Sequence, residues 1–98
     1  MGFVYVYFTK EKECKYIGQS VDWKRRFYQH SKTDMKDKIQ MIDSIVVFRC
    51  GNDKMNLIES YLINKYLPDW NKAIPKYIGN IDLSRYKRFW VPTSTLRG

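Results

Sequence analysis

The order of elements expected along the chain, β-β-α-β-α, predicts an α+β fold in which helices flank a three-stranded antiparallel sheet. Three runs rich in β-branched and aromatic residues are typical of strands, and they cover residues 3–9, 15–20 and 43–50. Two segments with apolar residues at helical spacing, 23–32 and 54–67, indicate helices that pack onto this sheet. Strands and helices that do not alternate regularly favour α+β over a parallel α/β architecture.

The first two strands should form a hairpin. Residues 3–9 have the sequence FVYVYFT, and the polar stretch after them is typical of a turn. Residues 15–20, KYIGQS, can then return antiparallel to the first strand. Tyr5 and Tyr16 would lie in these paired strands, where they could face the same side of the sheet.

The helix after the hairpin has a start signal and one face of mixed character. Ser20 or Asp22 can cap it, because a short side-chain oxygen accepts hydrogen bonds from the unpaired amides of the first turn. The helical spacing i, i+3, i+4 and i+7 places four residues on one face: Trp23, Arg26, Phe27 and His30.

The middle of the chain is less uniform in its signals. Residues 34–42 are ambiguous and could form a short helix, whereas residues 43–50 predict a buried strand. Asp53 can cap the second long helix, which should stop before Pro68 because a residue that precedes proline disfavours helical geometry.

A chain of 98 residues is long enough for one domain with a single core. We assign residues 1–72 to the core and residues 73–98 to an irregular basic C-terminal extension of the same domain. Residues 81–91 could add one more turn or strand to that extension.

The charge of the chain is positive and unevenly distributed. The net charge is +8, with +4 in residues 1–33, −1 in residues 34–71 and +5 in residues 72–98. Two basic ends around a near-neutral middle, together with 16% aromatic residues, suggest a nucleic acid partner.

The sequence gives no sign of membrane insertion or export. No apolar run approaches the ~20 residues that span a bilayer, and the N-terminus lacks the features of a signal peptide. Cys14 and Cys50 have no zinc-binding spacing. We therefore expect free thiols and a cytoplasmic location, in a bacterial or phage-infected cell.

Each polar candidate for a site has a structural explanation when taken alone. Glu59, at the edge of an apolar helical face, could be a solvated carboxylate, and His30 could lie at the edge of the core. Arg26 could be a stacked structural cation or a phosphate clamp. Tyrosines in strands, such as Tyr5 and Tyr16, usually serve packing.

Taken together, these residues form a recognisable pattern. Tyr5 lies on the first strand and Tyr16, Ile17 and Gly18 on the second; Arg26, His30, Glu59 and Asn71 follow. Over about residues 3–72 this pattern resembles the GIY-YIG nuclease family, most specifically in KYIGQSVDWKRRFYQH. The sequence departs from the family in the GIY half, where Phe3 replaces the glycine although the tyrosine is kept.

The resemblance implies metal-dependent hydrolysis of DNA phosphodiester bonds. Glu59 would hold one Mg²⁺, with Mn²⁺ as a substitute, because one carboxylate with several waters suits these ions. Arg26 would stabilise the phosphate, and Tyr5 would be the general base with Lys15 as its alternative. No small-molecule cofactor is expected.

The resemblance also implies supporting roles for other residues. Tyr16 would orient the phosphate or the water, and His30 would contact phosphate or relay a proton. Asn71 would order the site, and Gly18 would allow close approach where a side chain would collide.

We expect a larger set of residues to contact DNA, which would position the duplex without reading its sequence and would bind less tightly as salt rises. The candidates are Lys15, Gly18, Lys24, Arg25, Lys72, Lys76, Arg85, Lys87 and Arg88.

The string KYIG occurs a second time, at residues 76–79. Lys87 and Val91 stand where a second copy of the motif would need its arginine and histidine. We interpret this copy as a coincidence, or as a strand that covers a sheet edge.

Two other function classes stay open at this point. A non-catalytic nucleic-acid-binding module would use the aromatic and basic residues without needing Glu59. A structural or partner-binding protein would carry its charge incidentally. The sequence also leaves open the DNA specificity, the biological role, and whether a homodimer or a partner subunit completes the nuclease.

Overall fold

The computed structural model describes residues 1–33, 35–76 and 80–96. The regular elements follow in the order β1 (Gly2–Thr9), β2 (Cys14–Ser20), α1 (Trp23–His30), α2 (Lys36–Ile39), β3 (Ile42–Cys50), α3 (Met55–Tyr66) and β4 (Lys87–Pro92). Short 3-10 turns cover Asn52–Lys54, Leu83–Arg85 and Thr93–Thr95. The segment 77–79, which includes most of the second KYIG, lies outside the described residues, so the interpretation of this copy as a coincidence or an edge-covering strand stays a prediction.

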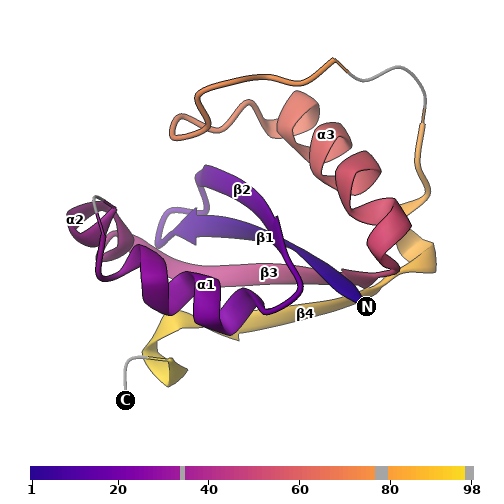
Figure 1. Ribbon diagram of the computed structural model, residues 1–98. Coiled ribbons are helices and arrows are strands. Elements are labelled where there is room, and N and C mark those ends of the chain that lie inside the picture. Colours follow the sequence, from indigo (N-terminus) through magenta and orange to yellow (C-terminus); the bar gives the residue numbers. More distant parts are fainter. Residues whose placement is uncertain (34, 77–79, 97–98) are drawn as a thin grey trace.

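The sheet is antiparallel throughout and has the strand order β2-β1-β3-β4 (Figure 1). The α+β class and the antiparallel sheet are therefore confirmed, but the prediction of three strands is wrong. The fourth strand, β4, lies within the extension that was expected to be irregular, and it pairs with residues 44–49 of β3.

The sequence signal of β4 is weak for a physical reason. Its residues, KRFWVP, are mostly exposed because it is the edge strand, so they show no buried alternation. Pro92 ends the strand, a position where a missing amide does not break the ladder. β4 is thus defined by its pairing with β3 rather than by its own pattern.

Helices cover the two faces of the sheet (Figure 1). On one face, Ile58 and Leu62 of α3 pack against Val4 and Val6 of β1. On the other face, Phe27 of α1 and Ile39 of α2 pack against a second cluster that includes residues 5, 7, 45 and 47. Because β1 is central, alternate residues of this strand enter both cores, which explains its continuous apolar sequence.

The ends of the helices follow the sequence signals in part. Asp22 caps α1, since its Oδ1 accepts a hydrogen bond of 3.1 Å from the Arg25 amide. The cap expected from Asp53 is wrong, because Asp53 lies inside a 3-10 turn and Lys54 takes the position before α3. The chain leaves α3 at Leu67, whose φ is 49°, directly before Pro68. None of the described helices is long and apolar enough to cross a membrane.

Candidate active site

Three tyrosines gather on the face of the hairpin that α1 covers. The register of β1 and β2 sets Tyr7 opposite Tyr16 and Tyr5 opposite Gly18, so the side chains point to one side. The ring centroids of Tyr5 and Tyr16 are 6.2 Å apart, and those of Tyr7 and Tyr16 are 5.6 Å apart. Tyr5 and Tyr16 thus meet as the sequence indicated.

Gly18 makes room for the Tyr5 side chain. A Cβ atom built on Gly18 would lie 2.5 Å from Cζ of Tyr5 and 2.8 Å from its Cε2, and it would also collide with the hydroxyl. Both distances are far below an ordinary contact between carbon atoms. Only glycine at this position lets the Tyr5 phenol lie across β2.

His30 completes the aromatic group from the last turn of α1. Its Nδ1 shares a hydrogen bond of 2.9 Å with the Tyr7 hydroxyl, and its ring meets Tyr16 edge-on at 5.5 Å. Tyr7 was not among the residues that the sequence singled out. The available signal was its position two residues after Tyr5, which puts both side chains on one face of a strand.

The environment of the tyrosines opposes the loss of their protons. Burial raises the pKa of Tyr5 and Tyr7 well above the ordinary value. Burial and the nearby Glu59 also raise the pKa of Tyr16, whereas Arg26 and the hydrogen bond with Tyr5 lower it. The same hydrogen bond raises the pKa of Tyr5, because the Tyr5 hydroxyl donates its proton to this bond and holds that proton more tightly.

Arg26 is an exposed residue on α1 whose charge acts on this group. Its guanidinium lies close enough to counter the effect of burial on the pKa of Tyr16. In the part of the chain that the structure describes, no carboxylate forms an ion pair with Arg26. The guanidinium is therefore available to an anionic ligand.

Glu59 reaches the site from α3, which packs on the other face of the sheet from the tyrosines, and it contacts Gln19 of β2. The carboxylate is half-buried, and this desolvation raises its pKa even though Gln19 Nε2 donates a 3.1 Å hydrogen bond to Oε1. Glu59 and Tyr16 line the same cavity, which has a volume of about 540 Å³ and includes Lys38 and Lys72 in its wall.

Asn71 is bound to the backbone of the strand that carries Tyr16. Its Nδ2 donates to the carbonyl of Ile17 at 2.9 Å, and its Oδ1 accepts from the amide of Ile17 at 3.0 Å. Beside it, the amide of Trp70 donates to the carbonyl of Lys15 at 2.9 Å. Asn71 thus pairs with β2 as a neighbouring strand would, which agrees with an ordering role.

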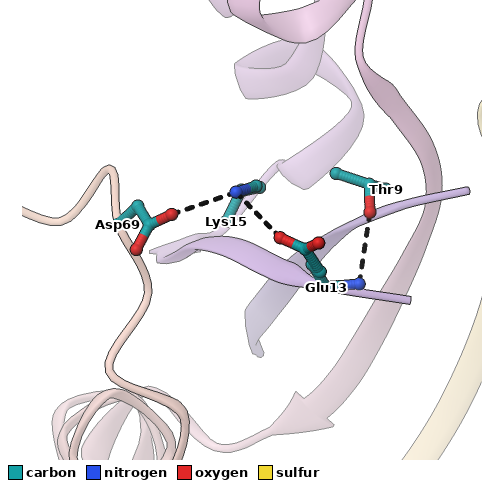
Figure 2. A network of polar contacts seen from close by, with 4 residues as sticks. All are labelled: Thr9, Glu13, Lys15 and Asp69. Atoms are coloured by element: carbon teal, nitrogen blue, oxygen red, sulfur yellow. Dashed lines mark hydrogen bonds and ion pairs between the residues drawn. The ribbon is translucent and has the colours of Figure 1, made fainter. Parts of the chain in front are cut away.

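Lys15 forms ion pairs with two carboxylates. Figure 2 shows its Nζ between Glu13 and Asp69, at 3.0 Å from an oxygen of each. The hydrogen bond with Asp69 and that with Glu13 raise the pKa of Lys15. A lysine in this state holds its proton, which weakens the case for Lys15 as a general base.

The predicted DNA contacts are spread over several parts of the surface. Lys24 and Arg25 are exposed on α1, and Lys72 lies at the cavity that Glu59 lines. Lys87 and Arg88 belong to β4, at the opposite edge of the sheet from β2. Two more candidates are exposed outside these elements: Lys76 in the segment after α3 and Arg85, which pairs with Asp82.

One of three comparisons with known proteins finds a family for this chain. A family model described as the GIY-YIG catalytic domain matches residues 1–73. No curated protein and no solved structure gives a significant match. The matched range contains Tyr5, Tyr16, Arg26 and Glu59, which the fold brings together. The chain belongs to the GIY-YIG family, whose members are nucleases.

Proposed function

We propose that the protein is a metal-dependent endonuclease that hydrolyses DNA phosphodiester bonds at the cavity between β2 and α3. The observation that carries this proposal is the meeting of Tyr16 and Glu59 at one cavity, with the unpaired Arg26 acting on Tyr16. A nuclease domain implies a DNA substrate, and the net charge of +8 favours a polyanion.

GIY-YIG nucleases generally use divalent metal ions, and Glu59 fits such an ion. Its carboxylate is desolvated, and among the described residues it has no cationic partner. The same part of the chain contains no cluster of three or more metal-ligating His, Cys, Asp or Glu residues. One carboxylate supplemented by waters and substrate phosphate suits Mg²⁺, with Mn²⁺ as a substitute. Such an ion neutralises phosphate charge and lowers the pKa of bound water.

Tyr16 is better placed than Tyr5 to accept a proton from the attacking water. Both tyrosines belong to the site, but Tyr16 lines the cavity with Glu59, whereas Tyr5 is only 2% exposed. Burial raises the pKa of both tyrosines, and the hydrogen bond between them raises that of Tyr5 further, whereas this bond and the charge of Arg26 oppose the rise at Tyr16. A divalent cation held by Glu59 would add positive charge that favours the ionised phenol, which is the form that accepts a proton. We therefore move the role of general base from Tyr5 to Tyr16, with Tyr5 as the phenol that supports it.

The other residues would bind and orient the substrate. Arg26 would contact a phosphate oxygen and stabilise the charge that develops in the transition state. His30, in edge-on contact with Tyr16, would contact phosphate or pass on the proton. Asn71 would hold the strand segment that carries Tyr16.

The test is plasmid nicking with Mg²⁺ or Mn²⁺ at saturating protein. We expect Glu59→Gln and Arg26→Ala to bind DNA and to cut at least ~10²-fold more slowly than wild type. Arg25→Ala is the matched control, because it removes the same charge from the next exposed position on α1 and should affect binding alone. If wild type binds but cuts neither plasmid nor branched DNA with either metal, the protein is a binding module and the proposal is wrong.

A further inference from the structure

A second groove lies on the sheet face that α3 covers, between α3 and β4. It has a volume of about 340 Å³. Phe8 and Val46 contribute to its floor, and its walls include Tyr66 from the end of α3 and Arg88 and Trp90 from β4. We call it the α3–β4 groove. It is separate from the cavity that Glu59 lines, with which it shares no lining residue.

The groove presents large aromatic rings to solvent. Trp90 is 58% exposed and Tyr66 is 43% exposed. The register sets Trp90 opposite Val46, so its ring lies on the α3 side of the sheet. Tyr66 meets Phe8 edge-on, with centroids 6.2 Å apart. An indole exposed at a sheet edge is a surface on which a planar ring can stack.

The charges around these rings are positive. Lys12 Nζ lies 5.6 Å from the centroid of Trp90, and Lys65 Nζ lies 5.7 Å from that of Tyr66. Arg88 and Lys65 line the groove itself, and no Asp or Glu belongs to its described lining. An occupant should therefore be anionic and carry flat rings, a combination that nucleic acids provide.

We propose that the α3–β4 groove binds a single-stranded DNA segment, with an unpaired base stacked on Trp90 and adjacent phosphates on Lys12, Lys65 and Arg88. Bases of a duplex are already stacked on one another, so an exposed ring gains most from a base that is unpaired. A second copy of this chain, at +8, would meet like charge there.

This inference rests on the proposed nuclease function and narrows its substrate. The catalytic tyrosines lie on the opposite face of the sheet from Trp90, so the two surfaces can hold different parts of one DNA molecule. The substrate class that fits both is DNA with an unpaired segment next to the cleaved strand, rather than an uninterrupted duplex.

The test is the affinity of the full chain for a short labelled single strand and for the matching duplex, measured by fluorescence anisotropy without metal so that no cleavage occurs. We expect wild type to prefer the single strand and Trp90→Ala to weaken this binding about 5- to 100-fold, as the loss of one stacked base does. Phe89→Ala is the matched control. Phe89 is 44% exposed on the same strand but faces the other side, so this variant should bind as wild type does.

A further variant and two further measurements separate the outcomes. Trp90→Leu keeps an apolar side chain and should weaken binding similarly, which protects the test if Trp90→Ala folds poorly. Equal affinities of the Trp90 and Phe89 variants, a preference for duplex, or a DNA-free dimer that depends on Trp90 would overturn the inference. If wild type nicks plasmid while the Trp90 variants bind single strands normally, the proposed role of the groove is wrong and the nuclease proposal is supported. If the Trp90 variants lose single-strand binding but no metal supports cleavage by wild type, the nuclease proposal is wrong instead.

Discussion

Replacing Gly18 with alanine should damage the active site more than the fold. The added Cβ would lie 2.5 Å from Cζ of Tyr5, where an ordinary carbon contact is about 3.5–4.0 Å, so the ring has to move by roughly 1 Å. Tyr5 cannot simply turn away, because it is 2% exposed and stacks on Tyr7 at 5.2 Å. Overpacking of this kind costs about 1–3 kcal/mol, which corresponds to a Tm lower by roughly 4–20 °C for a domain of this size.

The effect on cleavage should be larger than the loss of stability suggests. A displaced Tyr5 changes the hydrogen bond to Tyr16, which we propose as the base. A misplacement of about 1 Å in a catalytic group can cost on the order of 10² in rate. A glycine can contact DNA only through its backbone, which alanine keeps, so we expect Gly18→Ala to bind DNA as wild type does and to nick plasmid ~10²-fold more slowly at a temperature well below its Tm.

Gly2→Ala provides the control, because Gly2 lies in β1 and its new Cβ also meets a side chain, that of a residue in α3. This residue is Met55, whose Cγ would lie at 2.6 Å and whose Cε at 3.1 Å. A methionine side chain is flexible and can give way, so this variant should lose little stability and no activity. Wild-type cleavage by folded Gly18→Ala, or equal losses in the two variants, would refute the reasoning about Tyr5.

Three more predictions follow from the site. Tyr7→Phe removes the 2.9 Å hydrogen bond to His30, so the imidazole NMR signals of this single histidine should change and cleavage should fall about fivefold. Asn71→Ala leaves the amide and carbonyl of Ile17 without their partners and should destabilise the protein by about 1–3 kcal/mol in denaturant melts. Burial raises the pKa of Glu59 in the folded state, so its contribution to stability is present below the unfolded pKa and is lost as the pH rises through the folded pKa. Without metal, Glu59→Gln should therefore have a higher Tm than wild type at neutral pH and lose this advantage in acid.

Each of these predictions has a control or an outcome that contradicts it. Tyr28→Phe, at an exposed position on α1, should leave the imidazole signals of His30 unchanged, and unchanged signals in Tyr7→Phe would contradict the role of Tyr7. For Asn71, a melt equal to wild type would mean that water replaces both hydrogen bonds. For Glu59, a Tm difference that does not vary with pH would show that its ionisation is not the cause.

The sequence predicts the helices and strands that have an apolar pattern of their own. It does not predict a strand that forms only because a neighbouring strand pairs with it. β1, β2, β3 and α3 have strong apolar patterns and were predicted within a few residues of their observed ends. β4 was left open as a turn or strand near residues 81–91, because its exposed residues, KRFWVP, have no pattern that distinguishes an edge strand from a loop. The hydrogen bonds of β3 determine it, and those lie about forty residues earlier in the chain.

The site divides in the same way. The family pattern identified Tyr5, Tyr16, Arg26 and Glu59, which the fold brings to one place. It did not reveal Tyr7, since a tyrosine in a strand usually serves packing, and its bond to His30 depends on where α1 docks. Nor did it reveal the ion pairs of Lys15, because Asp69 approaches only once the chain has returned from α3.

The segment after Pro68 binds the outer side of β2. This contact explains why the family pattern, which is most specific around β2, extends as far along the chain as Asn71. β2 is an edge strand, so only β1 holds it in the sheet. On its outer side, Trp70 binds the carbonyl of Lys15 and Asn71 binds both backbone groups of Ile17. Tyr16 lies between Lys15 and Ile17 in β2, so the backbone is held on both sides of it. On a free edge, the tyrosine that we propose as the base would fray with the strand. This short return of the chain gives β2 a second partner, closes the edge to other chains and lines the cavity of Glu59 and Tyr16, so it supplies precision to the proposed site.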